Sequence, residues 1–262
     1  MALAAPSPSV FDFVVHVAQA YAKLIACREA RPESGLGGTL FYAGELDEQG
    51  RALVAAANIA GAATLTAAAD RALQKQAVRD GIVDFLVTPL DEALRILKNQ
   101  LRKRETVAVC VAAEPAAMER EMNERGVLPD LLRRDAHAAP LHEALLLQPG
   151  ESNETDLTAI PALVVWRVDS GAPNELAKLD EIAFACVDAN DWAARRWLRL
   201  APRYLGRLAQ GLRLLSTHRQ FAARFSGQLN ERVARGEIAF AYEVCPYFRG
   251  VLDQHRFDPE KS

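Results

Sequence analysis

Apolar residues in the middle of the chain alternate between short runs and longer helical patterns. Short runs, which are typical of buried strands, occupy residues 38–42, 63–67, 83–87, 106–112 and 128–132. Segments with apolar residues three or four positions apart, as on one face of a helix, lie between them at 51–60, 71–80, 90–102 and 115–125. Strands that alternate with helices of this length predict a parallel sheet covered on both faces. The expected fold class is therefore α/β, with a Rossmann-like parallel sheet flanked by helices.

Both ends of the chain add helical patterns to this centre. Residues 11–28 carry apolar side chains at helical spacing, and a loop rich in Gly, Pro and Ser follows at 31–38. The polar, acidic stretch 148–158 is expected to be a loop or boundary. We therefore predict an N-terminal helical segment, a Rossmann-like domain and a mainly helical C-terminal region with one strand, at residues 1–38, 39–147 and 159–262.

The C-terminal region is expected to contain one strand, at 162–168, and to be helical from about Glu175. One face of a predicted helix carries Leu205, Leu208, Leu212 and Leu215. A second helix follows with Phe221, Phe225, Leu229 and Val233 at similar spacing. Pro202 should break or kink the path between two helices, because proline removes a backbone donor.

The first predicted strand runs into a turn with glycines at its two ends, Gly44 and Gly50, and acids inside it. A strand, a turn and a helix in this order form the phosphate-binding unit of dinucleotide-binding folds. There, glycines let the backbone approach the pyrophosphate and helix N–H groups bind it. Here Glu45, Asp47 and Glu48 occupy the turn. One carboxylate–phosphate pair at about 4 Å costs on the order of 4 kcal/mol at an effective dielectric near 20. This turn argues against tight dinucleotide binding.

Three segments of the region resemble the nucleotide-binding domain of the urocanase (urocanate hydratase) family. They follow the family's order and read GTLFYAGELDEQGRALVAAANIAGAATL, DGIVDFLVTPLDEALRILK and VAVCVAAEPAAMEREMNERGVLPDLL. The pieces LDEALRIL and RGVLPDLL are the most telling, and the resemblance extends over about residues 39–135. It implies a Rossmann-like fold with a tightly bound NAD, which acts as an electrophile on the urocanate imidazole before water is added.

The resemblance places the family's glycine-rich turn on residues 44–50, where only the two end glycines are kept. The family's ribose-binding acid falls on Ala68, and Asp70 is the nearest carboxylate. Asp70 also suits the N-cap of the helix at 71–80. We assign Gly44, Gly50 and Asp70 as a degenerate cofactor site and expect no bound cofactor, with NAD as the alternative.

Other candidate chemistry is sparse. His137 lies where the family has conserved polar residues, and it is either a remnant ligand or a loop histidine. His137, His142 and Glu143 share no close helical face, so no metal site is predicted. Asp91 and Glu92 suit the first turn of a helix. No position matches the family's substrate-binding core, so no catalytic residue is assigned.

The cysteines predict reduced thiols and a cytoplasmic protein. They are far apart and form no CxxC motif: Cys27, Cys110, Cys186 and Cys245. No signal-peptide pattern and no long apolar run is evident, so we expect no membrane segment.

Positive charge gathers in one part of a chain whose formal net charge is −3. Residues 189–236 hold ten arginines, no lysine and only two acids. A helix through Pro202 would place several of these arginines on one stripe: Arg195, Arg196, Arg199, Arg203 and Arg207. The stripe is a solvated or internally paired face, a subunit interface, or a site for phosphate or nucleic acid. Nucleic acid is the least expected partner, because the nearby aromatic residues are spaced for core packing.

Three functions remain open. The leading hypothesis is a non-catalytic urocanase-like protein that has lost NAD. The second is a divergent NAD-dependent urocanate hydratase, and the third is an oligomerisation or regulatory module that acts through the Arg-rich helices. We expect a homodimer, since soluble oligomers are most often two-fold symmetric, and any small-molecule ligand is unidentified.

Overall fold

The computed structural model describes residues 8–27, 30–133, 145–146, 162–168, 173–209, 211–217, 219–248, 251–252 and 255–257. The chain divides into two compact units, residues 16–150 and residues 1–15 with 151–262. The division falls inside the first helix, α1 (Pro8–Ile25). The predicted boundary at residue 39 therefore differs from the structure, because most of α1 belongs with the sheet that follows it.

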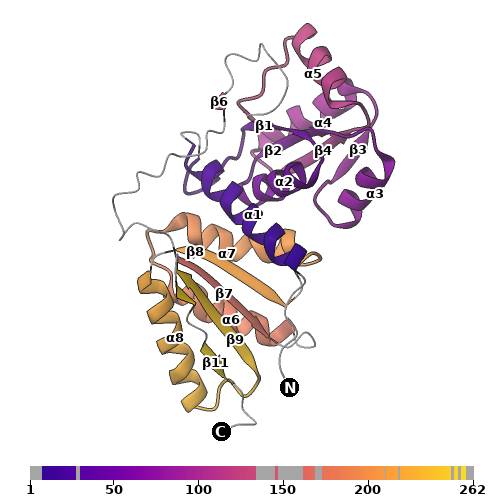
Figure 1. The fold of residues 1–262 in the computed structure, drawn as a ribbon. Helices are drawn as coiled ribbons and strands as arrows, with labels where there is room; N and C mark the ends of the chain where they lie inside the picture. Colours follow the sequence, from indigo (N-terminus) through magenta and orange to yellow (C-terminus); the bar gives the residue numbers. More distant parts are fainter. Residues whose placement is uncertain are drawn as a thin grey trace. The chain divides into compact units, whose positions relative to one another are not determined.

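A parallel sheet forms the centre of the unit at residues 16–150 (Figure 1), with the strand order β3-β4-β2-β1-β5-β6. All its strand pairs are parallel. The strands are β1 (Leu40–Glu45), β2 (Ala63–Ala67), β3 (Phe85–Val87), β4 (Val107–Val111), β5 (Leu131–Leu132) and β6 (Leu145–Leu146). This confirms the predicted Rossmann-like sheet. β2 and β4 are buried along their whole length, as their apolar runs predicted.

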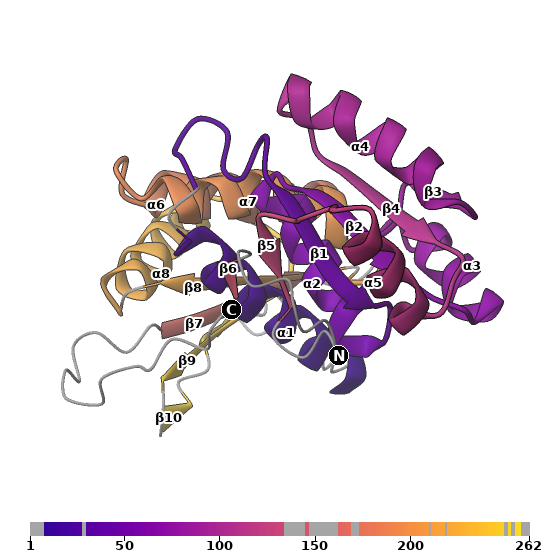
Figure 2. The ribbon, with the colours of Figure 1, turned by 90° about the horizontal axis from the view of Figure 1, so that it is seen from above.

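Helices cover both faces of this sheet (Figure 2). They are α2 (Glu48–Ala60), α3 (Arg71–Arg79), α4 (Leu90–Lys103) and α5 (Pro115–Glu124). On one face, α4 and α5 contribute Leu97 and Met118 to a core with Tyr42, Leu65 and Val109. α2 packs against β1 and β2, and its alanines are almost completely buried. Their small side chains let the helix lie close to the strands.

β3 forms one edge of the sheet, and two of its three residues are exposed. Phe85 and Leu86 are 46% and 41% exposed, whereas Val87 is buried. Asp84, just before the strand, accepts a hydrogen bond from the backbone N–H of Ala108 at 2.8 Å. This bond ties the short edge strand to β4.

The second unit contains an antiparallel sheet, so the prediction of a mainly helical region with one strand is wrong. The sheet has the order β10-β9-β7-β8, and β11 also pairs with β9. Its strands are β7 (Ala162–Val168), β8 (Leu212–Thr217), β9 (Tyr242–Phe248), β10 (Val251–Leu252) and β11 (His255–Phe257). Its helices are α6 (Pro173–Cys186), α7 (Trp192–Leu205) and α8 (Arg219–Ala234). The helix predicted through Leu212 and Leu215 ends at Leu205, because Gly211 turns the chain with φ +75° before β8 begins.

Trp166 on β7 is at the centre of this unit and is fully buried. Its ring meets Phe225 of α8 edge-on, with 5.3 Å between centroids. Its indole N–H donates to Asp180 Oδ1 on α6 at 2.9 Å, and Arg213 Nε donates to Asp180 Oδ2 at 2.9 Å. Burial raises the pKa of Asp180, while the Arg213 guanidinium opposes that shift. These contacts fix α6 and α8 on the sheet.

Pro202 lies inside α7, so of the break or kink predicted at this proline, the break is wrong. A proline in a helix removes a hydrogen bond and typically costs about 3 kcal/mol. Leu198, Ala201 and Leu205 are buried beside it, and their packing offsets this loss. α7 therefore remains one helix.

Across the described part of the chain, no helix combines the length and the hydropathy needed to cross a bilayer.

Candidate functional site

The direction of strand addition reverses at β1. The chain passes from β1 to β2 on one side, and after β4 it crosses back to β5 on the other side. Open α/β sheets bind ligands at such a switch point, beside the carboxyl ends of the strands. The candidate site is therefore formed by the end of β1, the end of β5 and the N-terminus of α2.

Two glycines shape the turn between β1 and α2. Gly44 has φ +71°, a left-handed conformation that favours glycine. Its carbonyl accepts a hydrogen bond from Thr66 Oγ1 at 2.8 Å. Gly50 lies in the first turn of α2, where a Cβ would be only 1.9 Å from the carbonyl oxygen of Glu45. The backbone conformation therefore explains both glycines, and no ligand is needed to account for them.

Asp47 occupies the N-terminus of α2. It is the N-cap residue, and its Oδ1 accepts a hydrogen bond from the backbone N–H of Gly50 at 2.6 Å. A carboxylate in this position satisfies a free donor and interacts favourably with the helix dipole. The first turn of α2 therefore already holds an anionic group from its own chain.

Arg133, directly after β5, holds the same carboxylate from the other side. Its two terminal nitrogens donate to Asp47 Oδ1 at 2.8 Å and Oδ2 at 3.0 Å, which is a bidentate pair. Arg133 is 8% exposed, and it also donates to Gln49 Oε1 at 3.2 Å. The charge of Asp47 is therefore paired within the protein. Glu45 and Glu48 are exposed beside it.

Sequence reasoning did not assign Arg133 to the site. Arg133 and Asp47 are 86 positions apart, and they meet only because β5 pairs with β1. The backbone N–H of Arg133 donates to the carbonyl of Tyr42 at 3.0 Å, so the β1–β5 pairing fixes its position. The available signal was an arginine directly after the fifth predicted strand, but its use requires the strand order.

A hydrogen bond between Tyr42 and Glu119 connects β1, the strand that leads into the site, to α5. Tyr42 O–H donates to Glu119 Oε1 at 3.2 Å, and both side chains are buried. Burial raises the pKa of the Tyr42 phenol, and the charge of Glu119 raises it further. Tyr42 therefore stays protonated and acts as a fixed donor that joins β1 to α5.

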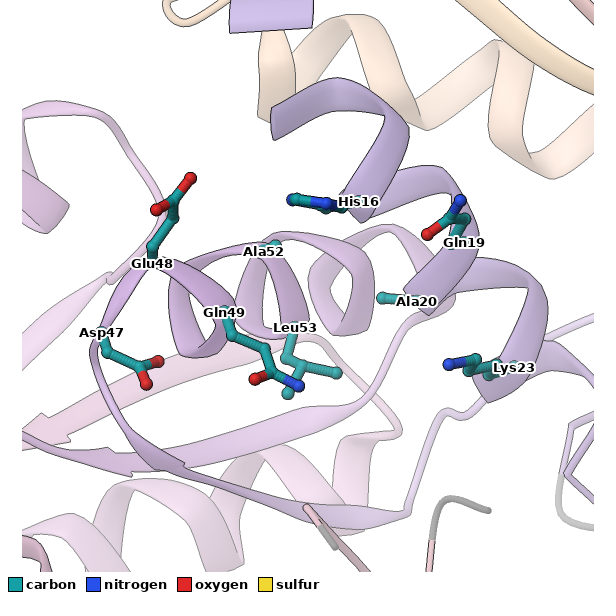
Figure 3. Close-up of a pocket in the computed structure, with 9 residues that line it drawn as sticks. All are labelled: His16, Gln19, Ala20, Lys23, Asp47, Glu48, Gln49, Ala52 and Leu53. Atoms are coloured by element: carbon teal, nitrogen blue, oxygen red, sulfur yellow. The ribbon is translucent and has the colours of Figure 1, made fainter. Parts of the chain in front are cut away.

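A cavity of about 500 Å³ lies beside the N-terminus of α2, against α1 (Figure 3). It is lined by nine residues from α1, from α2 and from the N-cap of α2: His16, Gln19, Ala20, Lys23, Asp47, Glu48, Gln49, Ala52 and Leu53. His16, Gln19, Lys23 and Glu48 are exposed, and Ala52 and Leu53 are buried. The cavity has an apolar floor and a charged rim.

Comparison with known protein families matches residues 16–146 to the urocanase Rossmann-like domain. The match spans half of the chain. The chain belongs to the urocanase family. The match begins at residue 16 and ends at residue 146, so it lies within the unit at 16–150 and includes the second half of α1. The resemblance read from the sequence is confirmed for the nucleotide-binding domain of urocanase.

At the switch point of this urocanase domain, groups that could bind the diphosphate of NAD are already engaged within the protein. The Gly50 N–H, a first-turn donor of α2, is bound to Asp47, and Arg133 is bound to the same carboxylate. Gly44 and Gly50 lie on either side of the acidic turn. The backbone geometry at each position is enough to explain why it is a glycine, without a role in binding a cofactor.

The position of the ribose-binding acid lacks a carboxylate. Ala68, at the end of β2, is 2% exposed, and its carbonyl accepts a hydrogen bond from Gln74 Nε2 at 2.6 Å. Asp70 caps α3 by accepting from the backbone N–H of Ala72 at 2.6 Å, which confirms the predicted N-cap. Its carboxylate is therefore engaged in helix capping.

The other candidate residues do not add to this site. Asp91 and Glu92 lie in the first turn of α4, as predicted. His137, His142 and Glu143 lie outside the described residues. Where side chains are described, no three of His, Cys, Asp or Glu gather as metal ligands would.

Proposed function

We propose that this protein is a non-catalytic member of the urocanase family whose Rossmann-like domain does not retain NAD. The observation that carries the proposal is the Asp47 carboxylate, held between the N-terminus of α2 and the buried guanidinium of Arg133. It takes the position in which a dinucleotide presents its diphosphate to this fold.

The energetics of displacement support this proposal. A diphosphate would have to remove Asp47 from Gly50 and from both nitrogens of Arg133. It would also come close to the exposed carboxylates of Glu45 and Glu48. Asp47 is 41% exposed, so a diphosphate would exchange one anion for another at Arg133 and would still lose the Asp47 cap of α2 while meeting these two carboxylates.

The first test is the cofactor content of the purified full-length protein. Ultraviolet absorbance and mass spectrometry after denaturation should detect no NAD. Calorimetric titration with NAD should show no saturable binding. Stoichiometric NAD in the purified protein would overturn the proposal.

A second test isolates the Asp47 carboxylate. Asp47→Ser keeps a capping oxygen but removes the carboxylate bound to Arg133, so the variant should bind inorganic pyrophosphate at least about tenfold more tightly than the parent, a change of about 1.4 kcal/mol. Glu48→Gln removes the same charge from the same turn without touching Arg133, and it should show little gain. Equal affinity of the parent and Asp47→Ser would contradict the role given to Asp47.

Catalysis by a divergent NAD-dependent hydratase is the alternative. It requires that the ultraviolet band of urocanate disappears when protein and NAD are both supplied. We expect an unchanged absorbance trace over a long incubation. Turnover that depends on added NAD would replace the proposal by this alternative.

The continuity of α7 favours one further role, assembly through the Arg-rich helix. Arg199 and Arg203 are exposed and four positions apart on an unbroken helix. Arg196 is buried, and Arg195 stacks over the ring of Phe184 at 4.1 Å, so these two have structural roles. The exposed arginines of the stripe, which could face a partner or a second copy in a homodimer, are Arg199, Arg203 and Arg207. Arg203 also lies over the ring of Tyr204, 5.4 Å from its centroid.

Charge reversal tests this assembly. If the stripe carries it, Arg199→Glu with Arg203→Glu should lower the mass measured by multi-angle light scattering. Lys98→Glu with Arg102→Glu, an exposed pair at the same spacing on α4, should leave the mass unchanged. An unchanged mass in the α7 variant would rule out the stripe as the interface.

A further inference from the structure

We propose that the cavity between α1 and α2 binds a short peptide of two or three residues through its free amino and carboxyl termini. The proposal does not depend on the absence of NAD, because it uses the side chains of Glu48, Gln19 and Lys23 and not the bond between Asp47 and Arg133. Of the residues that line the cavity, only Asp47 and Gln49 at its margin bond to Arg133 in the described structure.

The cavity carries charges of opposite sign at its two ends. Glu48 lies in the first turn of α2, and Lys23 lies near the end of α1 (Figure 3). His16 lies seven positions before Lys23 on α1, a separation of about 10 Å along the helix axis. In the described structure, the side chains of Glu48, Lys23 and His16 form no ion pair with one another. The two charges therefore remain available to a ligand that reaches both.

The groups between the two ends suit a peptide. Ala20, Ala52 and Leu53 form an apolar floor for small side chains. Gln19 lies on the rim, and its amide can both donate to and accept from a peptide group. Two or three extended residues span about 7–10 Å, which is comparable to the length of α1 from His16 to Lys23 along the cavity.

The charge pattern selects against other ligand classes. A purely anionic ligand such as a nucleotide would meet the Glu48 carboxylate, and a purely cationic ligand would meet the Lys23 ammonium. A peptide with free termini presents its ammonium group to Glu48 and its carboxylate to Lys23. The assigned orientation is therefore N-terminus toward α2 and C-terminus toward the end of α1.

Titration of the full-length protein with trialanine tests the proposal. Calorimetry or protein-observed NMR should show saturable binding with a dissociation constant of about 1 mM or tighter. Trialanine with an acetylated N-terminus and an amidated C-terminus should not bind. No saturation by trialanine, or equal binding of the blocked peptide, would overturn the proposal.

Variants locate the binding site. Glu48→Gln and Lys23→Gln should each weaken binding by about fivefold or more, an effect of about 1 kcal/mol. Glu45→Gln and Lys98→Gln remove exposed charges that do not line the cavity, and they should leave binding unchanged. Circular dichroism checks that each variant is folded. Loss of binding in the control variants, or none in the cavity variants, would place the site elsewhere. Because NAD content is measured separately, this proposal and the proposed function can fail independently.

Discussion

At the scale of single residues, the backbone around Gly50 leaves no room for a side chain. Gly50→Ala would place a Cβ against the Glu45 carbonyl, a backbone atom that cannot rotate away. We expect a loss of stability of about 1–3 kcal/mol or more. Gly227→Ala, inside α8 with no atom within 4 Å of its Cβ, should instead stabilise by up to about 1 kcal/mol. Urea unfolding of both variants measures the contrast, and similar stabilities would contradict it.

The two partners of the switch-point ion pair should differ in their effect on stability. Asp47→Ala leaves a guanidinium that is only 9% exposed without its carboxylate, which should cost about 3 kcal/mol. Arg133→Met leaves Asp47, which is 41% exposed, still bound to Gly50 and able to reach water. Its loss should be smaller, about 1 kcal/mol. Chemical denaturation gives both values, and the reverse order would show that Arg133 is not held mainly by Asp47.

At the scale of elements, the sequence predicted the central βα units because each pattern matched one local rule. The apolar run at Val107–Val111 and the cap at Asp70 are examples of such local signals. β8 was missed because Leu212 and Leu215 also fit a helical spacing, and the turn at Gly211 decides between the two readings. Arg133 was missed for a different reason, since its role depends on the pairing of β5 with β1.

A test at this scale concerns the end of α7. Gly206 lies directly after the helix, and a Cβ there would be 2.6 Å from the carbonyl oxygen of Pro202. Gly206→Ala should therefore disturb the transition to β8 and destabilise by about 1–3 kcal/mol. Gly236→Ala serves for comparison: it has open space but a φ of +72°, so it should cost only about 1 kcal/mol. Equal melting temperatures for the parent and Gly206→Ala would contradict the prediction.

At the scale of the whole molecule, buried thiols report on each unit separately. Burial raises the pKa of Cys110 in one unit, and of Cys245 in the other, to about 12 from an ordinary value of 9.0. At pH 8 these thiols should resist iodoacetamide, whereas the partly exposed Cys27 reacts first. Mass spectrometry of labelled peptides at increasing urea would show when each unit opens. Rapid labelling of native Cys110 would contradict its burial.

The same shifts predict a loss of stability in alkaline solution. The folded state favours the protonated thiols, so their contribution is complete below pH 9 and falls as the pH rises toward 12. Replacing Cys110 by alanine should reduce this dependence. Denaturation midpoints at pH 8 and pH 10 measure the effect, and an equal slope in the variant would assign it to other groups.

The exposed edge strand β3 has a consequence for the storage of the protein. An uncovered strand with two apolar side chains, Phe85 and Leu86, offers backbone donors and acceptors to any neighbouring chain. Concentrated or warmed samples should therefore aggregate through the β3 edge before the protein unfolds. A single lysine in place of Phe85 would interrupt such stacking and keep turbidity low during storage.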